Sequence, residues 1–587
     1  MSKVLLCGVF LLSAACSSSS SNGNGGGGAT STGGTSATPQ GGSSGNATVA
    51  GSASVGGNGT AGRAGAPGGG NATGGATGGM AGSAPGGGTG GGSTPTGSGS
   101  VTQRGGDSAR TSHWLAASLT KANVMTKMAL DADFKANFDG ELTSTPLFLA
   151  GATAGTGHFF AATTENDVYS LEELTGAQTW KHNIGGYLVT APVCGSDPKN
   201  HGIVSTPVID EASKTIYVAA AMTDGHHEIH ALSTDTGMEV AGWPVDVSKI
   251  KAGTLAFPSS VQNQRSALSL VNGILYVAFG GYCGDAGNYH GWVIGVNAAD
   301  PTKIGAWATM DSRQAGIWAA GGLASDGTGV FAVTGNAPET ANHDSSDSEE
   351  IIRITDLGTG NRDSKNMFYP TEWATPMNAK DQDFGSSSPT VVTVPDAKPS
   401  TIIVAPAKPG RVYFLDASNL GGSLGQFADM AVADTGGQSV YTTPTAYTTS
   451  SGVHVAISTG AGSQCPGGTP AANAVMSILL KPSAAGMAPM PSIVWCGAID
   501  SGDSSKRAPI STNSAGSADP VVWYLSGSRL LAFDGEDGTA LYDSSKAQPA
   551  SSCAGVHKFT SLIAVNGRIV AGGDSAGKAH LCSWSVH

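Results

Sequence analysis

Residues 166–176 read NDVYSLEELTG, a hydrophobic strand that ends in a turn at Gly176. Similar phrases return as EIHALSTDTG at 228–237, RVYFLDASNL at 411–420 and RLLAFDGEDG at 529–538. Each combines β-branched or aromatic residues with a turn near Asp-x-x-x-Gly, which indicates a strand followed by a tight turn. Repetition at roughly 50–65 residues, with several short strands per repeat, is typical of the blades of a β-propeller. The phrase therefore predicts an all-β fold.

The number of blades follows from the small-residue segments that lead into each repeat. The last of these segments leaves no room for an outer strand before His587, whereas residues 128–138 (MALDADFKANF) can supply one. Pairing of N- and C-terminal segments in one blade would close the ring and remove open sheet edges. We expect a single propeller of eight four-stranded blades, with seven blades as the alternative. The eight starts are Ser144, Ser205, Arg265, Ala320, Ser386, Tyr441, Arg507 and Lys558.

The first sixteen residues form an export signal. An apolar run at 4–12 follows Lys3 and is too short to span a bilayer. The segment 12–16 (LSAAC) resembles a bacterial lipobox, in which Cys16 becomes the lipidated first residue of the mature protein. An ordinary secretory signal cut elsewhere is the alternative, because Ser13 stands where Leu is more usual. Ser17, in place of Asp, favours the outer membrane. We expect an exported protein that a lipid anchor attaches to the bacterial envelope.

Residues 17–100 are almost entirely Gly, Ser, Thr, Ala and Asn, and Arg63 is their one charged residue. Such a segment cannot bury enough apolar surface to offset its ordering entropy. We interpret it as a disordered tether, with the propeller occupying residues 101–587.

The charge balance excludes one class of partner. The chain carries 43 acidic against 30 basic residues, for a net charge of −13. An acidic domain binds polyanions poorly, so nucleic acid is not an expected partner. The balance suits a soluble protein outside the cytoplasm. We expect a monomer.

The cysteine count indicates disulfides. Cys7 leaves with the signal and Cys16 carries the lipid, which leaves six cysteines in an exported chain. Repeat topology favours partners in the same or adjacent blades. No cysteine has CxxC spacing, so zinc or thioredoxin-like chemistry is not expected. The predicted pairs are Cys194 with Cys283, Cys465 with Cys496, and Cys553 with Cys582.

The repeat also resembles a known family. The phrase YSL at 169–171, followed by Thr175-Gly176 and Trp180, is similar to the quinoprotein-type (pyrroloquinoline quinone, PQQ-like) propeller repeat. DSART at 107–111, QNQRSAL at 262–268 and HGWV at 290–293 resemble exported bacterial members without a defined activity. The resemblance implies the fold more firmly than it implies catalysis, with PQQ and calcium as the cofactors that a dehydrogenase of this kind would take. However, the adjacent Cys-Cys pair and the CxxCH haem motif of PQQ dehydrogenases are both missing from the sequence.

One pair of loops has the composition of a ligand site. Residues 262–268 and 282–292 combine side chains that can hydrogen-bond to, and stack against, a sugar-like or planar ligand. The alternative is structural, with the Arg and His capping strand ends and the Trp packing between blades. The candidate residues are Arg265, Asp285, Tyr289, His290 and Trp292.

Two further clusters suggest metal sites. The acidic segment 342–350 (NHDSSDSEE) offers oxygen ligands for calcium, with an exposed acidic loop as the alternative. The segment 226–230 (HHEIH) places alternate side chains on one strand face, where a solvated hairpin is the alternative. The candidate ligands are Asp344, Asp347 and Glu349 in the first segment and His226, Glu228 and His230 in the second.

The absent catalytic signatures and the long tether favour a non-catalytic binding or scaffolding module. Its expected partners are the membrane, through the anchor, and either envelope proteins or a carbohydrate-like ligand. Two alternatives remain open: a PQQ-dependent sugar or alcohol dehydrogenase, and an outer-membrane assembly scaffold.

Overall fold

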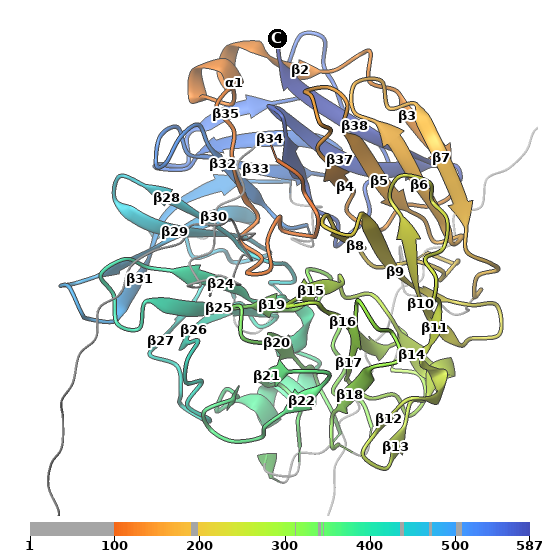
Figure 1. Cartoon of the computed structure of the whole chain (residues 1–587). Coiled ribbons are helices and arrows are strands. Elements are labelled where there is room, and N and C mark those ends of the chain that lie inside the picture. The colour runs from red at the N-terminus through yellow and green to blue at the C-terminus, as the bar shows by residue number, and fades with distance from the viewer. Residues whose placement is uncertain are drawn as a thin grey trace, which may run out of the picture. The chain divides into compact units, whose positions relative to one another are not determined.

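The computed structural model describes residues 99–189, 198–283, 285–311, 313–338, 342–343, 346–434, 439–468, 472–500 and 507–587. The predicted signal, Cys16 and the tether up to residue 98 lie outside the described residues. Within them, successive sheets are arranged around a common axis as eight blades (Figure 1). The predicted all-β propeller of eight blades is confirmed. Among these residues the helices are too short or too polar to cross a membrane.

In the first four blades an inner strand lies near the axis and later strands follow outward, each antiparallel to its neighbour (Figure 1). In chain order the strands are β4 (Leu147–Leu149), β5 (His158–Ala162), β6 (Asp167–Glu172) and β7 (Gln178–Asn183); β8 (Val208–Asp210), β9 (Thr215–Ala221), β10 (His227–Ser233) and β11 (Val245–Asp246); β15 (Ser269–Val271), β16 (Ile274–Gly281), β17 (Trp292–Asn297) and β18 (Ile304–Ala308); and β19 (Ala324–Ser325), β20 (Val330–Val333), β21 (Ile351–Thr355) and β22 (Thr359–Gly360).

The last four blades repeat this order. Their strands are β24 (Thr390–Thr393), β25 (Thr401–Ala407), β26 (Arg411–Asp416) and β27 (Ala428–Ala431); β28 (Thr445–Thr449), β29 (Gly452–Thr459), β30 (Ala474–Pro482) and β31 (Pro489–Ala498); β32 (Ile510–Asn513), β33 (Val521–Ser526), β34 (Arg529–Asp534) and β35 (Ala540–Asp543); and β36 (Ile563–Val565), β37 (Arg568–Ser575) and β38 (Lys578–Val586).

The remaining elements are short. Helix α1 (Lys121–Lys127) begins at Thr120, whose hydroxyl accepts a hydrogen bond from the Asn123 amide. The others are the strands β14 (Gln262–Asn263) and β23 (Met367–Phe368), the hairpin β12 (Lys251–Ala252) and β13 (Leu255–Ala256), and the helical turns η1 (Val247–Lys249), η2 (Ser259–Val261), η4 (Trp373–Asn378) and η5 (Phe384–Ser386).

Each predicted blade start lies three to five residues before an inner strand. The ring closes as expected, because β2 (Met128–Leu130) and β3 (Ala136–Asp139) both pair antiparallel with β38. Met128 lies opposite Val586, and Ala136 opposite Leu581. The first and last parts of the propeller therefore share its eighth blade.

Contacts between blades explain why the repeated strand-and-turn motif ends in glycine. Gly237 ends one copy with a φ of +72°, and a Cβ placed there would lie 2.7 Å from the ring of Trp180 in the preceding blade. The Trp180 Nε1–H donates to the Thr234 carbonyl at 3.0 Å. Gly538 and Trp495 repeat the arrangement, with a φ of +77° and a distance of 2.8 Å. The glycine is thus required by both its backbone conformation and the neighbouring tryptophan.

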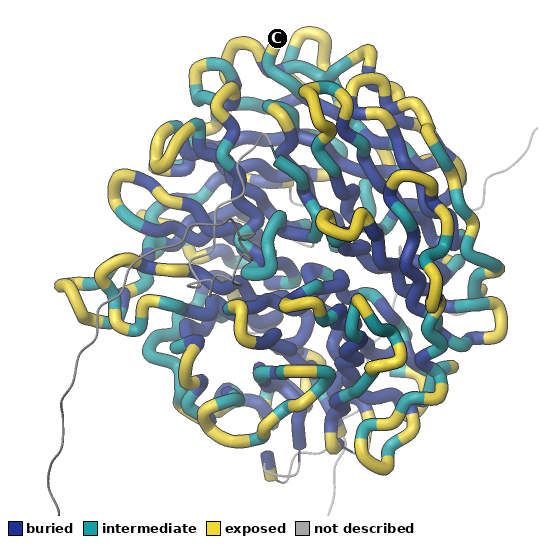
Figure 2. The backbone as a smooth tube through the Cα atoms, in the orientation of Figure 1, coloured by how far each residue is buried: buried dark blue, intermediate teal, exposed yellow. Residues whose placement is uncertain are grey.

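The core lies between blades. Leu147 and Phe160 of the first blade pack with Ile216 and Val218 of the second. In Figure 2 the buried residues follow the strands, whereas most exposed residues lie at turns and rim loops. Each blade therefore depends on its neighbours for burial of its apolar faces.

Two of the predicted disulfides are confirmed. Cys465 is bonded to Cys496 of β31, and Cys553 to Cys582 of β38. Cys283 is also disulfide-bonded. Its predicted partner, Cys194, lies outside the described residues.

Candidate functional site

Residues 101–116, which we call the axial segment, run through the middle of the ring (Figure 1). The segment ends in strand β1 (His113–Leu115), which pairs parallel with the inner strand β32. Before that, it exchanges backbone hydrogen bonds with the inner strands of other blades. These join Val101 to Phe148 (2.7 Å), Thr102 to Ile209 (2.7 Å), Ser108 to Ser325 (2.7 Å), Ala109 to Val391 (2.8 Å) and Thr111 to Ala446 (2.8 Å).

Arg110 anchors the segment at its centre. Its side chain is 0% exposed. Its guanidinium donates to the carbonyls of Arg104 (2.6 Å), Leu268 (2.9 Å) and Leu323 (3.1 Å). Burial lowers the pKa of Arg110 to about 10, so the side chain is still a cation at neutral pH. Arg110 therefore ties the segment to the third and fourth blades.

The axial segment leaves a pocket of about 710 Å³ at one end of the ring. The segment forms one wall, and the C-terminal ends of inner strands with their turns form the other. Aliphatic and hydroxyl side chains dominate the lining. The main residues are Ser108, Thr111, Leu115, Val391, Val392, Thr393, Thr401, Ala446, Thr448, Val453 and Ser517.

The titratable residues of this pocket are all engaged in structural contacts. Asp107 accepts hydrogen bonds from the amide and hydroxyl of Thr111, and burial raises its pKa. Burial also lowers the pKa of His113 to about 4. Asp326 forms an ion pair with Arg353 at 2.8 Å. The fourth such residue, Tyr447, donates to the Gly535 carbonyl at 2.8 Å. The lining thus offers hydroxyl groups and apolar surface to a ligand, and its titratable groups are held by other protein groups.

The opposite end of the ring carries charges. Strand β25 begins at Thr401 in the pocket wall and ends next to Lys408 at the other end. The Lys408 ammonium lies 2.8 Å from Asp381 and 2.9 Å from Asp383. Burial alone would lower the pKa of Lys408, but the two carboxylates outweigh it and raise the pKa. Lys408 therefore stays protonated and is not a general base.

Three of the predicted ligand residues meet around Trp318, which the sequence reasoning did not select. The Arg265 Nε–H donates to the Trp318 carbonyl at 3.0 Å. The Tyr289 ring lies edge-on to the Trp318 ring at 5.8 Å, and its hydroxyl donates to Asp285 at 2.6 Å. Tyr289 is fully buried. Its link to Trp318 gave no sequence signal, because 29 residues separate the two rings.

The other two predicted residues have structural contacts. Trp292 is fully buried and packs against Phe257 at 5.2 Å, in the core between the second and third blades. The backbone of His290 is held by the Gln262 side chain, at 2.8 and 2.9 Å. Trp292 therefore packs between blades, as in the structural alternative, and a ligand site at these loops stays a prediction.

The acidic segment is not the exposed loop of the alternative, and its calcium site stays a prediction. Asp344 lies outside the described residues. Asp347 and Glu349 are buried, so they do not form an exposed loop. Arg362 binds Asp347 through two nitrogens at 2.6 and 2.8 Å, and Glu349 accepts a hydrogen bond from the Phe384 amide. Burial raises the pKa of Glu349 well above its usual value, which favours the neutral form.

The histidine cluster lies on one strand face, as predicted. Glu228 approaches His226 and His230, with each pair at 3.3 Å. His230 also contacts Glu239 at 2.8 Å. These contacts form a chain of carboxylates and imidazoles at the start of β10.

Among the described residues, one group of three His, Cys, Asp or Glu side chains brings its ligand atoms within 4.8 Å of one another: Cys553, His580 and Cys582. Two of these atoms are sulfurs of a disulfide. These sulfur and imidazole donors do not fit calcium, which takes oxygen ligands. Calcium and PQQ binding therefore stay predictions.

No protein-family model and no curated protein sequence matches the chain. Solved structures do. The quinohemoprotein alcohol dehydrogenase from Comamonas testosteroni has a TM-score of 0.53 at 14% identity, over 82% of this chain and 80% of that one. A second such enzyme, from Pseudomonas putida HK5, has a TM-score of 0.55 at 13% identity, over 83% of this chain and 80% of that one. A europium-containing methanol dehydrogenase has a TM-score of 0.51 at 13% identity, over 83% of this chain and 98% of that one. The chain thus shares the eight-bladed fold of PQQ-type propellers.

Proposed function

We propose that this protein is a lipid-anchored, non-catalytic propeller of the bacterial envelope that binds a neutral, carbohydrate-like ligand in its axial pocket. One observation carries the proposal: the chain's own axial segment fills the middle of the ring and leaves a pocket whose titratable side chains are engaged in structural contacts. Hydroxyl groups beside aliphatic side chains suit a ligand that is polar but uncharged.

The proposed location rests on the sequence. The apolar run and Cys16 support export and lipidation. The disulfides are of the kind that persists in oxidising compartments.

Binding is tested by closing the pocket mouth. Ser517 is exposed at the rim of the pocket, so Ser517→Trp should obstruct it without changing the core. The control is Ala485→Trp, an exposed position in the turn between β30 and β31. A panel of neutral oligosaccharides would be screened by thermal shift and then by calorimetry. We expect S517W to weaken binding at least about tenfold and A485W to leave it unchanged. A panel with no binder, or equal binding by S517W, would contradict the proposal.

The absence of catalysis is tested separately. Purified protein is supplied with PQQ, calcium and an electron-accepting dye, then with alcohols and sugars. We expect no substrate-dependent dye reduction. Reduction that follows PQQ in a saturable way would instead establish a dehydrogenase.

The anchor is tested by Cys16→Ala, which removes the lipidated sulfur. We expect the wild-type protein in the membrane fraction and the variant in the soluble extracytoplasmic fraction. Equal distribution of both proteins would contradict the lipid anchor.

A further inference from the structure

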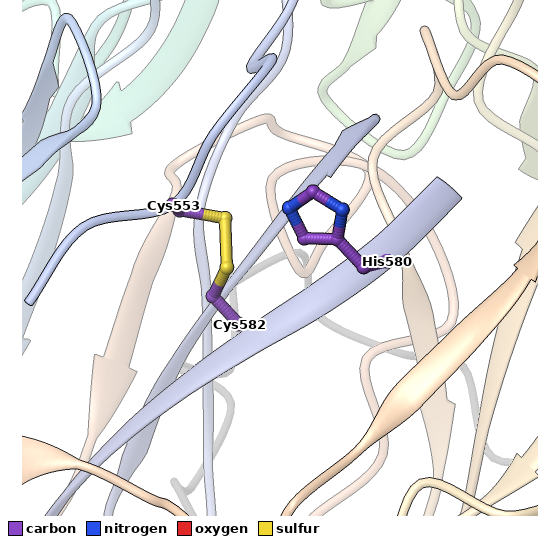
Figure 3. A group of neighbouring side chains, drawn as sticks. All are labelled: Cys553, His580 and Cys582. Atoms are coloured by element: carbon purple, nitrogen blue, oxygen red, sulfur yellow. A yellow bond between two sulfur atoms is a disulfide. The ribbon is translucent and has the colours of Figure 1, made fainter. Parts of the chain in front are cut away.

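Cys553, His580 and Cys582 form a three-ligand cluster at the eighth blade (Figure 3). His580 and Cys582 are two residues apart on β38, so their side chains leave the same face of the strand. Cys553 reaches them from the segment between β35 and β36. Cys553 is buried, whereas His580 and Cys582 are half-buried.

We propose that reduction of the Cys553–Cys582 disulfide creates a zinc site formed by the two thiolates and the His580 imidazole. Thiolate and imidazole ligands are those that Zn²⁺ prefers, and three protein ligands leave a fourth position for water or another donor. The site is closed to metal while the sulfurs are bonded to each other.

The reaction balances with a dithiol as the reductant. The dithiol gives two electrons and two protons, the sulfur–sulfur bond breaks, and Cys553 and Cys582 become thiols while the dithiol becomes a disulfide. Zn²⁺ then replaces the two thiol protons, which are released to water.

His580 is prepared as a ligand. Its imidazole projects from the same face of β38 as Cys582. The ring also hydrogen-bonds to the Ala554 backbone. Such a bond at one nitrogen fixes the ring and leaves the other for a metal. Figure 3 shows the imidazole beside the disulfide, with a ring nitrogen on the side that faces the sulfurs.

The same chain provides a matched control. The Cys465–Cys496 disulfide also joins a loop to a long strand. Within the described residues it has no third ligand atom close enough to complete such a group. Reduction alone should therefore not create a comparable site there.

The experiment uses Co²⁺ as a spectroscopic substitute for Zn²⁺. The chain is reduced with a dithiol without oxygen, freed of reductant and titrated with Co²⁺, and sulfur-to-cobalt charge-transfer absorbance is recorded. We expect no band for the oxidised protein and a band that saturates near about one ion per chain after reduction. His580→Ala should weaken binding by at least about tenfold, and the double variant Cys465→Ser/Cys496→Ser should bind like the wild type.

A second variant and a second measurement separate metal binding from folding. His580→Cys replaces the imidazole by a third thiol and should restore the band that His580→Ala weakens. Zn²⁺ should also raise the Tm of the reduced wild type, and not that of the oxidised protein. Equal Co²⁺ affinity for His580→Ala and wild type, loss of the band in the Cys465/Cys496 variant, or binding by the oxidised protein would each overturn the proposal.

Discussion

The axial segment and the pair β2 and β3 are neighbours in sequence, yet they extend the propeller at opposite edges of its blades. The axial segment adds the parallel strand β1 to the inner edge of the seventh blade and bonds to several other inner strands. Strands β2 and β3 pair antiparallel with β38, the last strand of the eighth blade. The inner addition shapes the pocket, whereas the outer one closes the ring. One stretch of about forty residues thus lines a pocket in its first part and closes the ring in its second.

Truncation should give the largest difference in stability between the axial segment and the pair β2 and β3. A chain that begins at residue 117 loses the axial segment, and a chain that begins at residue 141 also loses β2 and β3. We expect the shorter chain to expose the edge of β38 and to aggregate, whereas the longer one stays monomeric with a lower Tm. Size-exclusion chromatography with light scattering and circular dichroism measure both. A monomeric shorter chain with the same Tm as the longer one would show that the rim strands do not close the ring.

One arginine near each region allows the stability contributions of the axial segment and of the closing strands to be compared by single substitutions. Arg110→Met removes hydrogen bonds to three buried carbonyls, of which Leu323 keeps one from the Ser269 hydroxyl, and should lower the free energy of unfolding by about 3–5 kcal/mol. Arg568→Met, at a half-buried residue of β37, removes a hydrogen bond to the Glu173 carbonyl and an ion pair with Asp131 at 3.9 Å, and should cost about 1 kcal/mol. Denaturant unfolding measures both. Equal losses would mean that Arg110 does not anchor the axial segment.

The axial segment should also carry a dependence on pH. The pKa of buried His113 is about 4 in the folded protein against an ordinary value of 6.5, so the unfolded chain binds more protons between these values. Stability therefore falls as the pH drops from 6.5 towards 4, by up to about 3 kcal/mol from this residue. His113→Gln should flatten the curve, and His227 and His454 supply the remaining slope because burial lowers their pKa values too. Unfolding at a series of pH values tests this, and an unchanged slope in H113Q would contradict it.

The smallest expected difference in stability concerns the glycine that ends the repeated motif. Gly538 and Gly577 have nearly equal φ values, +77° and +75°, but only Gly538 packs against a tryptophan. Both Ala substitutions strain the backbone by about 1 kcal/mol. Gly538→Ala should cost about 1–3 kcal/mol more, because its Cβ meets Trp495 while the space around Gly577 is open. Equal Tm values for the two variants would show that the glycine serves only the turn.

Much of the architecture could be predicted because its signals are local. Three features follow from a repeat whose units contact their neighbours. These are the blade starts, the closing segment 128–138, and the disulfide pairs Cys465–Cys496 and Cys553–Cys582. The axial segment was missed because its partners are single residues on several blades, which produces no periodicity. The proposed zinc cluster was missed for a similar reason, since 27 residues separate Cys553 from His580.

The sequence by itself determined the all-β class, the closing of the ring and two disulfides, and favoured eight blades over seven, because strand periodicity and turn residues act over short distances. It also carries the predicted export signal and lipid anchor. Only the tertiary structure decided what fills the axis, that Tyr289 and Trp292 are buried in the core, and that Asp347 is neutralised by Arg362. Those outcomes depend on which residues the ring brings together from distant blades, and burial of that kind leaves no local pattern in a sequence.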